Sequence, residues 1–290
     1  MSAPPSAVPF DRPAVTVVIA VWDSYCALLP EAVASALTQQ AVDVELIVVD
    51  NASTAPLPPL PPRVTVLRSR DRLSAGAARN LALPHISAAA VLFLDADDVL
   101  LPGALHRLAA LLRNHPGAVA AVCKRLLWDP ASETEHVNER SPRPLVYRLC
   151  RWPRMFAALT LRYDVFQLTG CALLDTGVVR DAGGFGDASL AEDWMLRSAL
   201  AARGRVVFGR EAVVRFRVSG DSLWHREHSR EELDGTYGAF RAHRLSDPRL
   251  PRWGRALMPL IAVGHSHDIR RLTATGPFRP VEPGISYEPA

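Results

Sequence analysis

Four apolar segments rich in β-branched residues recur within the first 95 positions, and they restrict the fold more than any other feature of the chain. They are VTVVIAV at 15–21, VELIVVD at 44–50, VTVLRS at 64–69 and AAVLFLD at 89–95. Continuous apolar runs of this kind are typical of strands that are covered on both faces. Apolar residues at helical spacing follow the first run, at 28–37, and predict a helix. Strands that alternate with helices predict an α/β fold with a mainly parallel sheet.

Two of the predicted strands end on an aspartate, Asp50 and Asp95. In open parallel sheets, ligands bind outside the carboxyl ends of the strands, so we expect both residues to face one crevice. Asp95 also begins the acidic sequence Asp95-Ala96-Asp97-Asp98. Several carboxylates at a strand end form a hard-oxygen site suited to Mg²⁺ or Mn²⁺. The alternative is a solvated turn whose acidic residues cap the next helix.

Composition and charge narrow the class of partner and the compartment. The chain has 33 basic and 30 acidic residues and a net charge of +3, so the total indicates no polyanionic partner and does not support nucleic-acid binding. Its four cysteines are widely spaced, with no CxxC pair, as is typical of a reducing compartment. The N-terminus lacks the pattern of a secretory leader, and no window reaches 18 uninterrupted apolar residues. These features predict a cytoplasmic protein, with a peripheral location at the inner membrane face as the alternative.

Composition shifts divide the chain into four segments. We expect a disordered tail at 1–13, an α/β half at 14–126, a second half at 127–220 and a C-terminal helical segment with a loose tail at 221–290. Five prolines between 56 and 62 exclude a normal helix and predict a short, extended crossover between two strands.

Local patterns predict further elements beyond the first strands. Pro102 is expected to open a helix. The pattern over 170–186 predicts a strand, a short helix and a glycine turn, and the pattern over 191–204 predicts a helix. Two short strands are expected at 205–219, and a helix at 221–243.

The order of these motifs resembles glycosyltransferase family 2. VTVVIAVWDS, ELIVVDNAS, SAGAARN and VLFLDADD carry the resemblance over 14–126, and TGCALL, GGF and EDWMLRSALAARG extend it to about Arg217, with 127–168 outside it. The resemblance implies a GT-A fold, in which a nucleotide-sugar-binding half abuts an acceptor-binding, catalytic half around one mixed, mainly parallel sheet flanked by helices. It also implies a metal-dependent enzyme that takes a sugar from a nucleotide diphosphate donor, expected to be a UDP-sugar, with Mg²⁺ or Mn²⁺ as the cofactor.

The resemblance implies roles for residues at the donor end of the site. Asp50 would hydrogen-bond the nucleobase, and the strand end at Val21 would line the base pocket through backbone groups. The family usually has a second acid where this chain has Asn51, which leaves the identity of the base open. Arg79 would contact phosphate or ribose oxygens, and its alternative is a surface salt bridge. A similar role is weaker for Arg72, which is expected in a loop.

The resemblance also implies the metal ligands and the catalytic base. Asp95 would contact the donor ribose, or the metal through water, and Asp97 would be the principal metal ligand, with Asp98 supporting it. Glu192 and Asp193 open a predicted helix, where Asp193 would be the general base of an inverting transfer. The alternative for both acids is ordinary helix capping.

Three features have weaker assignments. His225 and His228 share a helix face and could bind a metal or phosphate, although solvated surface histidines are the commoner case. Arg217 and Ser222 would lie where the family has a loop that closes over the diphosphate. The basic, aromatic stretch at 145–162 suits an acceptor-side lid, a membrane-surface helix or a plain buried amphipathic helix.

The leading hypothesis is therefore an inverting family 2 glycosyltransferase. A nucleotidyltransferase is the alternative enzyme, but it would need a glycine-rich, basic phosphate loop after the first strand, and VWDSYCALLP has neither glycine nor a base there. A catalytically inactive nucleotide-sugar-binding protein is the third hypothesis. The acceptor could be a saccharide, a lipid-linked sugar, a natural product or a peptide, and the sequence determines neither the acceptor nor the oligomeric state.

Overall fold

The computed structural model describes residues 12–138, 148–163, 165–186, 192–218 and 229–275, with side chains up to 265. The strands are β1 (Ala14–Val21), β2 (Asp43–Asp50), β3 (Val64–Arg68), β4 (Ala90–Asp95), β5 (Val99–Leu100), β6 (Ala118–Asp129), β7 (Thr134–Val137), β8 (Ala172–Asp175) and β9 (Arg205–Arg217). The helices are α1 (Leu29–Leu37), α2 (Ala75–Asn80), α3 (Ala104–Arg113), α5 (Pro153–Arg162), α6 (Thr176–Asp181), α7 (Glu192–Arg203), α8 (Arg230–Ser246) and α9 (Arg252–Thr275).

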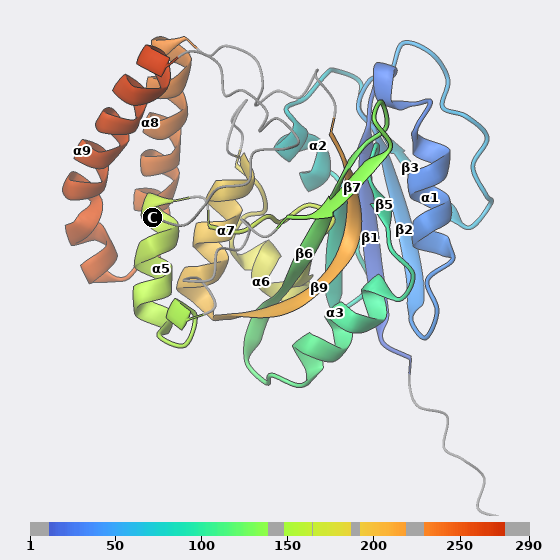
Figure 1. The fold of residues 1–290 in the computed structure, drawn as a ribbon, viewed down its shortest axis with the longest axis horizontal. Coiled ribbons are helices and arrows are strands. Elements are labelled where there is room, and N and C mark those ends of the chain that lie inside the picture. The colour runs from blue at the N-terminus through green and yellow to red at the C-terminus, as the bar shows by residue number, and fades with distance from the viewer. Residues whose placement is uncertain (1–11, 139–147, 164, 187–191, 219–228, 276–290) are drawn as a thin grey trace, which may run out of the picture.

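Within the described residues, the strands form one nine-stranded mixed sheet in the order β3-β2-β1-β4-β8-β6-β9-β5, and β7 pairs with β6. The pairs among β3, β2, β1 and β4 are parallel, whereas β8 runs antiparallel to both β4 and β6. Helices cover both faces of the sheet (Figure 1). The α/β fold with a mixed sheet is the one that the sequence predicted, and all four apolar runs form strands of the parallel part.

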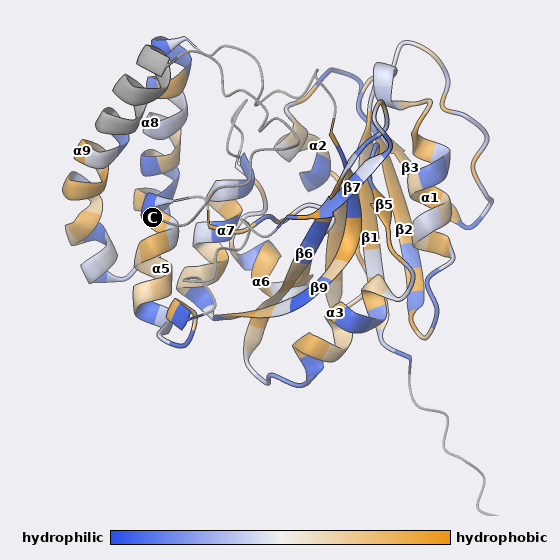
Figure 2. Ribbon diagram, viewed as in Figure 1, coloured by the Kyte–Doolittle hydropathy of each residue, from blue (hydrophilic) through white to orange (hydrophobic). Residues whose placement is uncertain are grey.

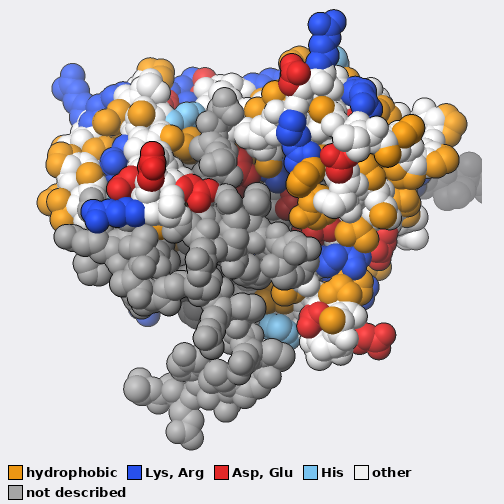
Figure 3. All heavy atoms as spheres, turned by 90° about the horizontal axis from the view of Figure 1, so that it is seen from above, with side chains coloured by type: hydrophobic (Ala, Val, Ile, Leu, Met, Phe, Trp, Pro, Cys, Tyr) orange, Lys and Arg blue, Asp and Glu red, His pale blue; other side chains and the backbone are white. Residues whose placement is uncertain are grey.

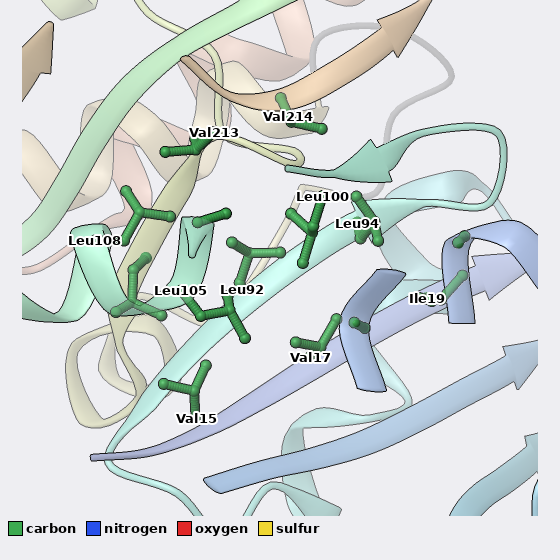
Figure 4. Packing of buried hydrophobic residues seen from close by; sticks show 14 of the residues in the cluster. Val15, Val17, Ile19, Leu92, Leu94, Leu100, Leu105, Leu108, Val213 and Val214 are labelled. Atoms are coloured by element: carbon green, nitrogen blue, oxygen red, sulfur yellow. The ribbon is translucent and has the colours of Figure 1, made fainter. Parts of the chain in front are cut away.

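Two apolar layers hold the helices against the sheet. On one face, alternate residues of β1 and β4 pack against α1 and α3, as the side chains of Val17, Leu92 and Leu105 show (Figure 4). On the other face, the intervening residues, such as Val18 and Phe93, pack against α2, α6 and α7. Because strand side chains alternate between faces, each parallel strand contributes to both layers, which explains why these segments are apolar throughout.

The proline-rich segment between β2 and β3 is the extended crossover that the sequence predicted, without helix. Its Leu57 and Leu60 pack against the core layer under α1. The prolines thus connect two parallel strands while their neighbours cover part of the sheet that a crossover helix would normally cover.

Two predictions of local structure were wrong. Residues 205–217 form the single strand β9, not two short strands, because β9 follows β6 along its length through a register irregularity near Val122 and Lys124. A side chain at Gly209 would lie 2.5 Å from Cys123 Sγ, so this glycine permits close approach of the strands without ending either one. Pro102 does not open α3, since the residue that caps the helix is Gly103, whose φ of +74° favours glycine.

The C-terminal helices form a layer beside the sheet. The helices α8 and α9 pack on each other, on α5 and on α7 through a cluster that contains Trp194, Phe240 and Met258. The helix expected at 221–243 begins at Arg230. The predicted tails, at 1–13 and over roughly the last 15 residues, fall mostly outside the described residues, as does 219–228.

Candidate active site

The carboxyl edge of the parallel strands brings together residues that are far apart in the sequence. In the sheet register, Val21 of β1 lies beside Asp50 of β2, and Ala20 lies beside Asp95 of β4. The two aspartates therefore flank the end of the same strand. Their side chains leave from opposite faces, since Asp50 continues the alternation of Leu46 and Val48, whereas Asp95 continues that of Val91 and Phe93. Figure 3 views this edge from above and shows acidic side chains among basic and apolar ones.

Asp50 is buried, and both of its carboxylate oxygens have partners. Oδ1 accepts a hydrogen bond of 2.9 Å from the Ser53 amide, and Oδ2 forms an ion pair with Arg68. Arg68 also donates to the Ser53 carbonyl at 2.8 Å. A surface depression of about 470 Å³ lies beside this pair, and the proline-rich segment forms much of its wall. The proline-rich segment therefore shapes the surroundings of Asp50, a role that the sequence did not reveal.

Asn51 and the end of β1 form a compact backbone arrangement next to Asp50. The Asn51 amide donates to the Val21 carbonyl at 2.9 Å. The Asn51 side chain donates through Nδ2 to the Leu73 carbonyl at 3.0 Å and accepts through Oδ1 from the Leu73 amide at 2.9 Å. In the loop before Leu73, the Arg72 guanidinium lies 3.2 Å from the centre of the Trp22 ring. Trp22 is an aromatic residue of this edge that sequence reasoning did not single out, although it directly follows the first strand.

Asp97 and Asp98 lie in the tight turn between β4 and β5. Burial and the nearby Asp95 raise the pKa of Asp97 to about 6. Asp98 is fully buried, and burial with two neighbouring carboxylates raises its pKa well above the ordinary value. Its Oδ1 accepts a hydrogen bond of 3.1 Å from the Arg217 amide, while Arg217 Nε donates to the Asp97 carbonyl at 3.2 Å. The end of β9 is thus attached to the acidic turn, so Arg217 lies beside the acidic cluster.

The carboxylates of this turn suit a divalent cation that a substrate also coordinates. Within the described part of the chain, no three His, Cys, Asp or Glu side chains form a metal cage. Mg²⁺ sites commonly need only one or two carboxylates, because substrate phosphates and water complete the shell. Burial and the neighbouring carboxylate of Asp95 raise the pKa of Asp97, and Asp98 Oδ2 is buried with no hydrogen-bond partner among the described residues. The carboxylate oxygens of Asp95 and Asp97 are therefore suitable ligands for Mg²⁺ or Mn²⁺.

Arg79 connects the acidic turn to the catalytic helix expected from the sequence. Its Nη2 lies 2.7 Å from Asp95 Oδ1, and its Nη1 lies 2.9 Å from Glu192 Oε1. Only 9% of the Arg79 side chain is exposed. Burial alone would lower the pKa of Arg79, but the two carboxylates raise it above the ordinary value. The sequence suggested that Arg79 is a phosphate ligand or forms a surface salt bridge. It did not suggest that one buried guanidinium pairs with both Asp95 and Glu192.

Close packing fixes α2 against the start of α7. Ser74 caps α2 by accepting a hydrogen bond of 3.2 Å from the Ala77 amide. Asn80 Nδ2 donates to the Phe185 carbonyl and Asn80 Oδ1 accepts from the Phe185 amide, each at 2.9 Å. A side chain at Gly76 would lie 2.4 Å from the Gly186 carbonyl oxygen. The residues around Gly76 and the pair Phe185 and Gly186 therefore pack closely beside Arg79 and Glu192.

Glu192 and Asp193 open α7. Burial and the charge of Glu192 raise the pKa of Asp193 to about 7, whereas Arg79 opposes this rise. Asp193 also forms an ion pair with Arg197 one turn along the helix, a contact that favours the ionised carboxylate. Arg197 is fully buried, and burial lowers its pKa to about 9. Sequence reasoning missed Arg197, although its spacing of four from Asp193 on a predicted helix was a usable signal.

The structure thus brings Asp95, Asp97, Arg79, Glu192 and Arg217 into one connected arrangement, with Asp50 at the neighbouring strand end. Ser222, His225 and His228 lie outside the described residues.

The chain has an α/β fold with one mixed sheet, and comparison with known proteins identifies its family. Residues 16–172 match the family model Glycosyl transferase family 2. Because this range exceeds half of the chain, the protein belongs to glycosyl transferase family 2, and it has a GT-A fold. The matched range includes 127–168, where the sequence motifs had shown no resemblance.

Individual relatives are more distant. The chain is 34% identical to the succinoglycan biosynthesis protein ExoO of Rhizobium meliloti over 101 residues. The aligned residues cover 33% of this chain and 29% of ExoO. The structure resembles S. aureus TarS 1–349 in complex with UDP, with a TM-score of 0.55 and 17% identity over 80% of this chain and 66% of that one. It also resembles the mannosyltransferase PcManGT from Pyrobaculum calidifontis in complex with GDP-Man and Mn²⁺, with a TM-score of 0.57 and 20% identity over 92% and 84%. At such identities these structures support the fold.

None of the described helices combines the length and the apolar character that crossing a bilayer requires.

Proposed function

We propose that the protein transfers a sugar from a nucleotide diphosphate donor, a UDP-sugar in the first instance, to an acceptor hydroxyl with inversion at the anomeric carbon. The observation that carries the proposal is the connection through Arg79 of the acidic turn with the start of α7. It brings a group suited to the leaving diphosphate and a group suited to proton abstraction into one connected arrangement.

In this proposal, residues 14–126 bind the donor and residues 127–220 supply the base and the acceptor side. Asp50 and the strand end at Val21 contact the nucleobase, with Arg68 orienting the Asp50 carboxylate. Asp95 and Asp97 hold Mg²⁺ or Mn²⁺. When bound, such a cation neutralises the negative charge that develops on the leaving diphosphate.

Asp193 would act as the general base. Its carboxylate takes the proton of the acceptor hydroxyl as the acceptor oxygen forms a bond to the anomeric carbon. The bond from that carbon to the diphosphate oxygen breaks, and its electron pair remains on the leaving group. A pKa of about 7 suits this task, because a base with a pKa near the working pH combines sufficient ionisation with sufficient proton affinity. Arg197 orients the base through its ion pair with Asp193, and the neighbouring charge of Glu192 raises the proton affinity of the base.

The ligands of the structural neighbours guide the choice of substrates. TarS 1–349 has been crystallised with UDP and UDP-GlcNAc, and PcManGT with GDP-Man and Mn²⁺. The relative ExoO is a succinoglycan biosynthesis protein, which favours a saccharide as the first acceptor to test. Lipid-linked sugars, natural products and peptides remain further acceptor classes, and a peripheral contact at the inner membrane face would suit a lipid-linked acceptor.

The test is release of nucleoside diphosphate from a panel of UDP- and GDP-sugars with Mn²⁺, with and without acceptor, alongside thermal stabilisation by UDP and GDP. We expect one donor to be turned over and its diphosphate to raise the Tm. Asp193→Asn should keep the Tm shift and lose turnover. A Tm shift with no turnover of any donor would favour an inactive nucleotide-sugar-binding protein. The absence of both a Tm shift and turnover would refute the proposal.

A further inference from the structure

The outer surface of α5 and α9 combines exposed apolar side chains with arginines. These helices lie at the opposite end of the molecule from β3 and α1, and their outward faces carry hydrophobic colour in Figure 2. Five large apolar side chains are at least half exposed, with exposed fractions from 50% to 70%. We call this the flank surface, and its apolar members are Trp152, Met155, Tyr163, Leu260 and Val263.

Contacts between the two helices make the flank surface continuous. Arg162 Nη2 donates to the Gly264 carbonyl at 3.3 Å, and its guanidinium lies 4.4 Å from the centre of the Tyr163 ring. A side chain at Gly264 would lie 2.4 Å from Arg162 Nε, so the absence of a side chain lets Arg162 cross α9 closely. Leu260 precedes Gly264 by one helical turn and therefore lies on the same side of α9 as the residue that Arg162 contacts.

Helical periodicity places the exposed apolar residues on the outward side of each helix. On α5, Met155 and Arg162 are seven residues apart and share a face, whereas Phe156 and Leu161 are buried. On α9 the buried face contains Met258, Ile261 and His265, which leaves Leu260 and Val263 pointing outward. Both helices therefore carry large apolar side chains on their outward faces as well as on their buried faces, which is uncommon for a surface helix.

The two helices and the residues next to them are rich in arginine, and one of these arginines, Arg249, is ion-paired with Asp181 at 2.8 Å. Residues 148–163 contain four arginines and residues 249–265 contain three, and neither range contains an aspartate or glutamate. Because the whole chain has a net charge of only +3, the positive charge is concentrated at these helices. The arginines are Arg148, Arg151, Arg154, Arg162, Arg249, Arg252 and Arg255.

We propose that the flank surface docks on an anionic lipid bilayer, with its apolar side chains at the headgroup boundary and its arginines against lipid phosphates. Charge complementarity selects this occupant, since exposed apolar groups set among cations match a negatively charged, apolar interface. Trp and Tyr are the side chains favoured at such an interface. A second copy of the same surface would place like charges opposite each other, which disfavours self-association.

The test is co-sedimentation of the full chain with vesicles of neutral lipid and of neutral lipid mixed with an anionic phospholipid. We expect binding to the anionic vesicles that weakens with salt. Arg154→Gln with Arg252→Gln should lower the partition coefficient about 30-fold, equivalent to about 2 kcal/mol at about 1.4 kcal/mol per tenfold. The matched control is Arg70→Gln with Arg113→Gln, which removes the same charge from exposed sites elsewhere and should leave the partition coefficient within about threefold of the parent.

The apolar contribution is tested with Leu260→Ser and Val263→Ser, matched by Val66→Ser and Val137→Ser at exposed sites on β3 and β7. The first pair should lower the partition coefficient at least about tenfold, and the second should not. An unchanged Tm in all variants shows that folding is intact, and unchanged donor turnover without vesicles separates docking from catalysis.

Three results would overturn the proposal. The first is equal binding to neutral and anionic vesicles, or binding that the flank variants leave unchanged. The second is a concentration-dependent dimer in sedimentation velocity that Leu260→Ser with Val263→Ser abolishes, which would assign the surface to a second copy. The third is the absence of binding by the full chain and its appearance after removal of 276–290, which would assign the surface to the chain's own C-terminus.

Discussion

Replacement of Arg79 by methionine tests whether this residue acts as a link between acids or as a direct ligand of the donor. The guanidinium forms ion pairs of 2.7 Å with Asp95 and 2.9 Å with Glu192. Removing one partner of a fully buried ion pair costs about 3 to 5 kcal/mol. The Asp95 and Glu192 side chains are 28% and 16% exposed, so water relieves part of this cost, and we expect the free energy of unfolding to fall by about 2 to 3 kcal/mol.

The same substitution should change the titration of the base. Arg79 lowers the pKa of Asp193 and Glu192 raises it, so loss of Arg79 leaves the effect of Glu192 unopposed. At an effective dielectric constant of about 20, one nearby positive charge stabilises the ionised form of a carboxylate by about 1 to 2 kcal/mol, which shifts its pKa by about one unit. The acidic limb of the kcat profile, near pH 7 in the parent enzyme, should therefore move upward by about that amount.

The assay is nucleoside diphosphate release under saturating donor between about pH 5 and 9, with unfolding measured by denaturant titration. Arg79→Lys should recover the pH profile in part, because a single ammonium retains the charge but cannot span both carboxylates. Arg107→Met is the matched control, since it removes an exposed ion pair of similar length with Glu211. If Arg79→Met raised only the KM for the donor and left the pH profile in place, Arg79 would be a phosphate ligand, as the sequence suggested.

Three further predictions follow from the site. Asp193→Asn should lower kcat by about 10² to 10⁴ without weakening UDP binding, and an unchanged kcat in this variant would exclude Asp193 as the base. The activity of the parent enzyme should fall as the pH drops below about 7, because the base is then protonated. Asp97→Asn should abolish the Mn²⁺-dependent part of the Tm shift by UDP, whereas Asp129→Asn, in the exposed β6–β7 hairpin, should preserve it. Gly184→Ala should cost about 2 kcal/mol or more, since φ is +76° and its Cβ would lie 2.2 Å from Asn80 Oδ1. By contrast, Gly238→Ala in α8 meets nothing within 4 Å and should be neutral or stabilising by denaturant titration.

The parallel half of the fold could be predicted because its signals are local. Each strand of that half is a continuous apolar run, and the acids that follow β2 and β4 had to reach one sheet edge. The second half was less predictable because pairing determines its elements. In β9, Gly209 is followed directly by the exposed polar residues Arg210 and Glu211, a pattern that resembles a break, yet pairing with β6 keeps the strand continuous across that point.

The candidate site could be predicted as a set of residues but not as a set of contacts. Motif order identified Asp95, Arg79 and Glu192 separately. Their connection depends on Gly76 and Asn80, which bring α2 close enough to α7 for one guanidinium to reach both carboxylates. No pattern in a single sequence specifies that distance, because it follows from packing between segments more than 100 residues apart.

Asn51 shows how the structure alters the interpretation of a departure from the family pattern. At the level of sequence, an amide at a position where the family usually has an acid leaves the identity of the nucleobase open. In the structure, the same amide both donates to and accepts from the Leu73 backbone, which a carboxylate cannot do because it has no proton to donate. This pairing fixes the loop that leads into α2 and so supports the helix that carries Arg79. Asn51 therefore has a structural role that is independent of the donor, and in the proposed function selection of the nucleobase is assigned to Asp50.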